Sequence, residues 1–208
     1  MRRILMGVVA VALATMSGSA VRAQSAAVSP TDKEKALAYL ESTKKGVLEA
    51  TKGLSEAQWN FKPGPERWSV AEVMEHIATS EDFLRGLGEK QVKDVPVGTP
   101  LPEADQKKDD EMLLKGMPDR TQKHQAPEPL KPTNKYGSGE AARKHFIESR
   151  ATTVAFLKDT PDLRGHLADS QMGMKMDGYE WVLAVAGHSE RHTKQILEVK
   201  ADPNFPKN

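Results

Sequence analysis

Three histidines in this chain are of a type and spacing that could hold a metal ion. His188 and His192 lie four residues apart in a segment with helical periodicity, so their imidazoles are about 40° apart around the helix and ~6 Å apart along its axis. Two imidazoles placed in this way can converge on one ion. A pair with this spacing also arises by chance on helix surfaces, and a buried pair can be satisfied by hydrogen bonds instead.

The third histidine, His76, is distant in sequence but falls on the same kind of helical stripe. It lies between Val73 and Phe83 on one apolar stripe, and the other two histidines interrupt a stripe that includes Trp181 and Ile196. We therefore expect all three imidazoles to face the core, where each must stay neutral or find a partner. One divalent metal ion would partner all three, and the sequence predicts a metal site formed by His76, His188 and His192.

No residue near these histidines is a convincing general base. Glu72 and Glu180 are expected to cap helix starts, because each follows a capping residue by three positions. Glu75 and Glu190 adjoin the histidines in sequence but point away from them around the helix. We therefore assign no catalytic residue, and the absence of a base leaves the reaction open.

Other polar side chains are given simpler roles. Arg191 is expected to form a surface ion pair. Gln195, one turn beyond His192, could orient a ligand or water, or could be solvated. The other histidines are expected to be exposed or hydrogen bonded: His124, His145 and His166. Three loop methionines are expected to cover the end of the fold rather than bind a soft metal: Met172, Met174 and Met176.

The elements that must position the three histidines are four long helices. Apolar periodicity, capping residues and helix-stopping Gly or Pro place them at about residues 31–52, 69–87, 138–160 and 178–199. Between them, residues 54–68 form an irregular segment whose aromatic side chains are expected to seal one end of the core. No run alternates for long enough to require a sheet.

A long connection separates the second and third helices. Seven of the thirteen prolines lie between Glu89 and Tyr136, which leaves room for only a short helix at about residues 106–117. Four helices with two short links and one long link fit an all-α fold, an antiparallel four-helix bundle with a long crossover.

The first 23 residues have the pattern of a signal peptide. Arg2 and Arg3 precede an apolar run, and a Val-x-Ala sequence ends at Ala23. The alternative is a membrane anchor, but a spanning helix needs ~20 apolar residues and this run is interrupted by Gly7 and Thr15. We expect an exported protein, periplasmic or secreted, with a tether at 24–30, a bundle at 31–200, a tail at 201–208 and no stable membrane anchor after cleavage.

The amino-acid composition limits the kinds of chemistry and of binding partner that the protein can have. The 208 residues contain no cysteine, which excludes disulfides, a thiol nucleophile and a lipoprotein anchor. The segment 1–23 carries three arginines and no acid, so its removal leaves 27 basic against 29 acidic residues, a net charge of about −2. No concentrated basic face is evident, and no nucleic-acid partner is expected.

Two segments also carry a resemblance to a known family. Residues 68–77 (WSVAEVMEHI) and 187–196 (GHSERHTKQI) resemble the two signature segments of the DinB-like superfamily, and the likeness extends over about residues 31–200. The resemblance implies an antiparallel four-helix bundle that holds a divalent metal ion (Zn, Ni, Fe or Mn) by one histidine of its second helix and two of its fourth. His76, His188 and His192 occupy those positions.

Three interpretations of function follow. Three nitrogen ligands would leave coordination positions open, as in catalytic zinc sites, and the resemblance implies hydrolase-like or thiol-transferase-like chemistry on a small molecule. Export argues against thiol transfer, because low-molecular-weight thiols are mainly cytosolic. The second interpretation is a non-catalytic metal- or ligand-binding bundle in stress response or sensing. The third is a hydrogen-bonded histidine core in an interaction protein, and relatives imply that two copies can pair as a homodimer.

Overall fold

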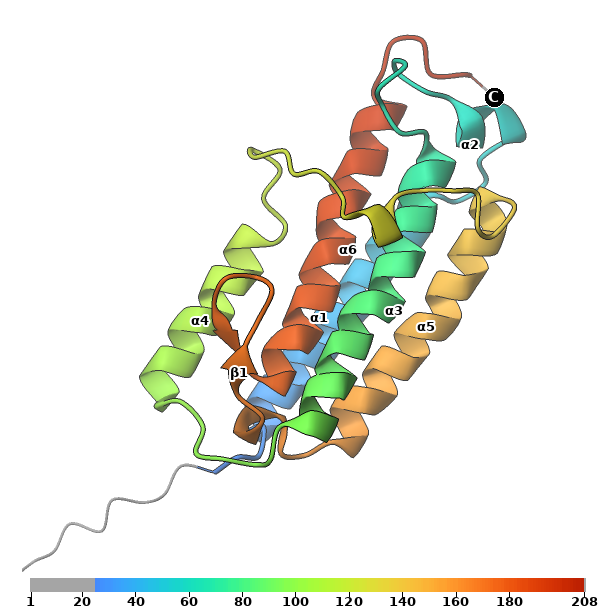
Figure 1. The fold of residues 1–208 in the computed structure, drawn as a ribbon. Helices are drawn as coiled ribbons and strands as arrows, with labels where there is room; N and C mark the ends of the chain where they lie inside the picture. Colours follow the sequence, from blue (N-terminus) through green and yellow to red (C-terminus); the bar gives the residue numbers. More distant parts are fainter. Residues whose placement is uncertain (1–24, 208) are drawn as a thin grey trace, which may run out of the picture.

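Four long helices dominate the fold (Figure 1). The computed structural model describes residues 25–207, so the signal peptide expected at residues 1–23 lies outside the described part. The long helices are α1 (Pro30–Ala50), α3 (Val70–Asp94), α5 (Gly139–Asp159) and α6 (Gly178–Lys200). The expected all-α four-helix bundle is confirmed, and only α3 departs clearly from its expected length, extending seven residues beyond residue 87.

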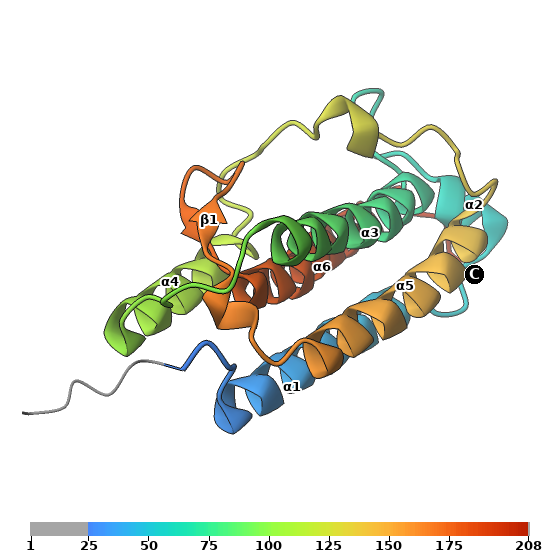
Figure 2. The same ribbon diagram turned by 60° about the horizontal axis from the view of Figure 1, so that its bottom comes forward.

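Each long helix packs against two of the others. Helix α3 packs on both α5 and α6, and α1 packs on the same two helices (Figure 2). Helices α1 and α6 run in the same direction, because the Tyr179 hydroxyl donates to the Asp32 carbonyl at one end and Lys200 donates to the Ala50 carbonyl at the other. Helices α3 and α6 are antiparallel, since His76 meets His192 and Gln91 accepts from Trp181. Helices α1 and α5 are antiparallel as well, since Lys33 donates to the Lys158 carbonyl and Arg150 donates to the Leu40 carbonyl.

The bundle has parallel as well as antiparallel neighbours because of the long crossover, the connection of residues 95–138 between α3 and α5. It starts where α3 ends, runs back along the bundle and delivers the chain to α5 at the end where α3 begins (Figure 1). The crossover contains α4 (Glu103–Gly116) and η1 (Glu128–Leu130). The other short elements are α2 (Glu56–Asn60), between α1 and α3, and η2 (Leu163–Gly165), β1 (Ala168–Asp169) and β2 (Lys175–Met176), between α5 and α6. The two strands form one short antiparallel hairpin. The short helix expected at 106–117 corresponds to α4, which packs on α6.

Capping boxes start the two helices that carry the histidines. The Ser69 amide donates to Glu72 at 2.7 Å, and the Asp177 amide donates to Glu180 at the same distance. Each carboxylate thereby satisfies a backbone donor at a helix start. The cap roles predicted for Glu72 and Glu180 are confirmed.

Aromatic side chains close the end of the bundle near α2. Trp59 is buried against Gly139 at the start of α5, where a Cβ atom would come within 2.3 Å of the indole ring. Phe61 meets Phe205 edge to face at 5.5 Å between ring centroids. The C-terminal segment after α6 is therefore packed on the bundle through Phe205.

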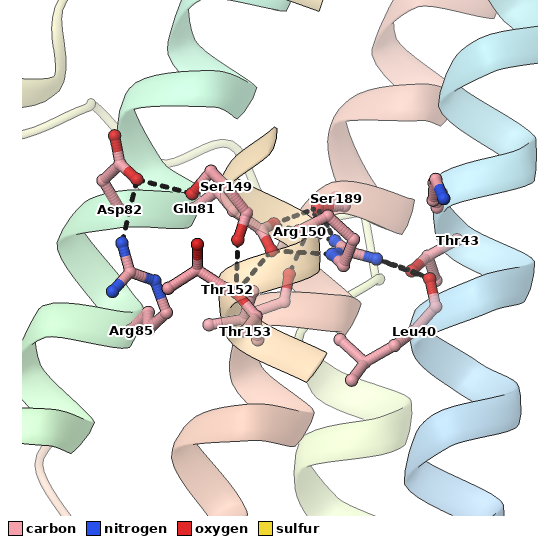
Figure 3. Close-up of polar contacts among 12 residues, drawn as sticks. Leu40, Thr43, Glu81, Asp82, Arg85, Ser149, Arg150, Thr152, Thr153 and Ser189 are labelled. Atoms are coloured by element: carbon pink, nitrogen blue, oxygen red, sulfur yellow. Dashed lines mark hydrogen bonds and ion pairs between the residues drawn. The ribbon is translucent and has the colours of Figure 1, made fainter. Parts of the chain in front are cut away.

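A buried ion pair joins all four long helices (Figure 3). Arg150 of α5 and Glu81 of α3 are each 1% exposed, and two guanidinium nitrogens donate to the carboxylate at 2.6 and 2.8 Å. The guanidinium also donates to the Leu40 carbonyl at 2.6 Å and to Thr43 at 2.8 Å, both on α1, and to Ser189 of α6 at 2.8 Å. Every charged atom of the pair is therefore hydrogen bonded.

The substitution Arg150→Met should destabilise the fold by about 3–5 kcal/mol, because it leaves Glu81 buried and without a counter-charge. Urea unfolding followed by circular dichroism measures this loss. Arg143→Met is the matched control, since Arg143 forms a partly exposed pair with Glu140, worth at most about 1 kcal/mol. Equal losses in the two variants would contradict the structural role assigned to Arg150.

Candidate metal centre

The three histidines of the sequence analysis meet on one side of the bundle. His76 projects from α3, and His188 and His192 project from α6 one turn apart. One ring nitrogen from each lies within 4.8 Å of the other two. His76 is 3% exposed and His192 is 8% exposed, whereas His188 is partly open. The antiparallel packing of α3 on α6 is what brings these distant residues together.

Hydrogen bonds orient two of the imidazole rings. His76 Nδ1 lies 2.8 Å from the Leu130 carbonyl oxygen, which can only accept, so the proton sits on Nδ1. His192 Nδ1 donates in the same way to Gln195 Oε1 at 2.7 Å, and Arg120 donates to the same oxygen at 3.3 Å. Both rings therefore present an unprotonated Nε2, and these two nitrogens face each other at 3.2 Å.

The lone pairs of the two Nε2 atoms face each other, and at neutral pH neither nitrogen gains a proton that would turn the contact into a hydrogen bond. Burial lowers the pKa of His76, and burial together with the neighbouring His76 lowers the pKa of His192 to about 3. Burial, followed by the proximity of His192 and His76, holds the pKa of His188 well below its ordinary value. All three rings are therefore neutral near pH 7, the state in which imidazole binds metal.

The donor set fits a divalent metal ion. Two nitrogens bound to one tetrahedral ion at ~2.05 Å lie about 3.3 Å apart, close to the 3.2 Å between Nε2 of His76 and Nε2 of His192. The Leu130 carbonyl and the Gln195 amide are the supporting partners that metal-binding histidines usually have. Gln195 thus takes the orienting role that the sequence left open, while the Leu130 carbonyl has no signal in the sequence.

A cavity of about 900 Å³ opens beside the histidines. Its walls come from α3, α6 and the crossover, which arches over this side of the bundle (Figure 2). Trp68 packs against His76 at 5.0 Å between ring centroids. A small molecule in this cavity would lie next to the three imidazoles.

The carboxylates beside the histidines in sequence are used elsewhere. Glu75 accepts from the backbone amides of Thr133 and Lys135 at 2.7 and 3.1 Å. Glu190 accepts from the Tyr39 hydroxyl at 2.8 Å. Both point away from the histidines as expected, and neither is placed to act as a base.

Arg191 differs from its expected role. The prediction of a surface ion pair is wrong: the side chain is 8% exposed, lines the cavity and donates to the Gln122 carbonyl at 2.5 Å. The cause is the crossover, whose residues after α4 cover this face of α6. Helical periodicity alone could not reveal that covering segment.

The remaining histidines lie outside the cluster. His145 pairs with Asp82 at 2.6 Å, and His166 donates to the Val95 carbonyl at 2.6 Å. His124 is exposed at the edge of the cavity. The expectation that these side chains are exposed or hydrogen bonded is confirmed.

The loop methionines pack rather than cluster with the histidines. Met176 is fully buried and Met174 packs on the same apolar cluster, whereas Met172 is 44% exposed and lines the cavity. The expectation that these methionines cover the end of the fold is confirmed for Met176 and Met174.

Fold and site together define a class: helical bundles with a three-histidine cluster between two helices. Residues 39–196 match the DinB superfamily, and the chain belongs to that family. The uncharacterized protein YuaE of Bacillus subtilis (strain 168) is 27% identical over 152 residues, which cover 72% of this chain and 87% of YuaE.

A solved structure supports the fold. Bacillus subtilis YfiT, described as "a probable metal-dependent hydrolase with an unusual four-helix bundle topology", superposes with a TM-score of 0.51 at 14% identity, over 86% of this chain and 91% of YfiT. At this identity the likeness shows the fold alone. In the part of the chain that the structure describes, every helix is too short or too polar to cross a membrane.

The low pKa of His192 predicts a pH-dependent stability in the metal-free protein. Unfolded His192 binds a proton below about pH 6.5, but the folded side chain does not until about pH 3. Its contribution is therefore complete above pH 6.5 and is lost as the pH falls. Lowering the pH from about 7.5 to about 5.5 should remove about 1.4 kcal/mol through this residue.

Urea unfolding in the presence of a chelator, at both pH values, measures this effect. His192→Asn should reduce the pH-dependent loss by the amount given, whereas the exposed control His124→Asn should retain the wild-type loss. An unchanged pH dependence in His192→Asn would show that the folded imidazole titrates normally.

Proposed function

We propose that this protein is a metal-dependent hydrolase acting on a small molecule in the cavity beside the histidines. The observation that carries the proposal is the pair of unprotonated Nε2 atoms of His76 and His192, held 3.2 Å apart in a buried site. His188 completes the cluster from the preceding turn of α6. The description of YfiT as a metal-dependent hydrolase supports the same class of activity.

The three imidazoles would hold the ion, and a set of three nitrogen donors suits Zn, Ni, Fe or Mn. A divalent metal bound there supplies Lewis acidity, which polarises a carbonyl or phosphoryl group. The chain itself orients the ligands, since the Leu130 carbonyl and Gln195 hold two rings by their Nδ1 atoms. Trp68 and Leu130 of the crossover cover the His76 side of the site.

Non-catalytic metal or ligand binding is the second candidate. The positions of Glu75 and Glu190 favour it, because each carboxylate is engaged by donors away from the cavity. A hydrolase of this design would depend on the metal and on substrate positioning, without a carboxylate base from either residue. Measured turnover distinguishes the two candidates.

Metal content tests the proposal directly. The chain is purified without a histidine tag, reloaded with zinc, and analysed by elemental mass spectrometry and for hydrolysis of p-nitrophenyl acetate. We expect one ion per chain and metal-dependent turnover. His76→Ala and His188→Ala should weaken metal binding by more than the ~10- to 100-fold that loss of a supporting residue costs.

His145→Ala is the matched control and should retain the ion, because His145 pairs with Asp82 outside the cluster. Undiminished metal binding in both cluster variants would contradict the site. One bound ion without turnover on a panel of esters, amides and phosphoesters would favour the binding protein over the hydrolase.

We also propose that the chain is exported, with residues 1–23 removed. The support is the arginine pair, the apolar run and the small residue Ala23 at the end of the segment. Mass spectrometry of the periplasmic fraction of a Gram-negative host should find a chain that begins at Gln24. Ala23→Asp should block cleavage, and intact cytoplasmic wild-type protein would contradict export.

A further inference from the structure

The cavity beside the histidines has an excess of positive charge. Five lining side chains are cationic and two are carboxylates. Arg120 is neutralised by Glu198, which it contacts at 2.7 and 2.8 Å, and Lys131 pairs with Glu128. The cationic groups that remain are Arg67, Lys123 and Arg191, against the single carboxylate of Glu66.

Arg191 is the most informative of these groups. Its side chain is 8% exposed, and its one hydrogen bond within the described residues goes to a neutral acceptor, the Gln122 carbonyl. No carboxylate of residues 25–207 forms a salt bridge with it, unlike the buried Arg150 and Arg164. The nearest carboxylates, Asp119 and Glu198, lower the energy of its charge without a direct ion pair, so an anion in the cavity could still supply charge-assisted hydrogen bonds to the guanidinium.

The end of the cavity near Trp181 and Leu87 is apolar. Trp181 precedes His188 by seven residues, ~10 Å along α6, and Leu87 follows His76 by eleven residues, ~16 Å along α3. Because α3 and α6 are antiparallel, these apolar residues lie at one end of the site. Other lining side chains of this end are Phe83, Leu84, Met117 and Met172.

The cationic side chains lie at the level of the histidines and beyond them, away from the apolar end, since Arg191 lies between His188 and His192 on α6. Arg67 comes just before α3, and Arg191 lies one turn beyond His188 toward the end of α6. Lys123 reaches the same region from the crossover. The cavity thus has an apolar end near Trp181 and a cationic end that begins at the histidines.

We infer that the substrate is a small amphipathic anion, with a carboxylate or phosphate group held by Arg191, Arg67 and Lys123 and an apolar group packed near Trp181 and Leu87. The bond to be cleaved then lies between the two ends, beside the histidines. A volume of about 900 Å³ accommodates such a molecule. This inference rests on the proposed function and names the substrate class of the same site.

Calorimetric titration of the zinc-loaded mature chain tests the inference with four probes: octanoate, octyl phosphate, acetate and octyltrimethylammonium. Octanoate or octyl phosphate should bind at least ~10-fold more tightly than the cation of the same chain length, and more tightly than acetate, which lacks the apolar group. The stronger of the two octyl anions identifies the preferred head group. Equal binding of the octyl anions and the octyl cation would overturn the inference.

Charge-removing variants locate the anion. Arg191→Gln should weaken binding of the preferred octyl anion ~10- to 100-fold, the effect of losing a hydrogen bond to a charged group. Arg191 also donates to the Gln122 carbonyl, so its loss could change the crossover as well as the charge. A second variant therefore replaces two exposed side chains, Arg67→Gln/Lys123→Gln. It should bind the anion more weakly and with a smaller dependence on salt concentration. Arg143→Gln/Lys144→Gln removes the same charge from α5, outside the cavity, and should leave binding unchanged.

The same titrations on chelator-treated protein separate this inference from the proposed function. The cationic side chains belong to the chain, so the preference for the octyl anion over the octyl cation should persist without metal. If that preference is present but zinc does not bind the histidines, only the metal-dependent function fails. If zinc binds but Arg191→Gln and Arg67→Gln/Lys123→Gln both bind octanoate and octyl phosphate like the wild type, the anion site is wrong.

Discussion

The buried pair between Arg150 and Glu81 is the interaction on which the rest of the structure depends. A guanidinium inside the bundle must satisfy its donors, and it does so by reaching α1, α3 and α6 from α5. This requirement restricts how the helices can slide along one another. Its partner Ser189 adjoins His188, and Glu81 lies five residues beyond His76, so the pair sets the register in which the histidines meet.

The histidine cluster gains its chemistry from this register. Two imidazoles are each fixed through Nδ1, one by a backbone carbonyl of η1 and the other by Gln195. Their Nε2 atoms then face each other without protons, because burial keeps the rings neutral. An arrangement that is unfavourable for free imidazoles is favourable for metal binding, which agrees with the family to which the chain belongs.

The crossover turns a cluster of ligands into a site with walls. It provides the Leu130 carbonyl, it covers Arg191, and it carries Lys123 to the cavity. Without it, the face of α6 that bears the histidines would be open to water. The long, proline-rich connection is therefore part of the site as well as a link between helices.

Periodicity and capping signals in the sequence were enough to determine the four helices, the long connection, and the inward placement of His76, His188 and His192. These features depend on contacts between residues close in sequence, which a helical repeat records. Only the tertiary structure decided the parallel neighbours of the bundle, the Arg150–Glu81 pair and the burial of Arg191. Each of these depends on side chains brought together from segments far apart in the chain, and no local pattern encodes which distant segment will cover a given helix face.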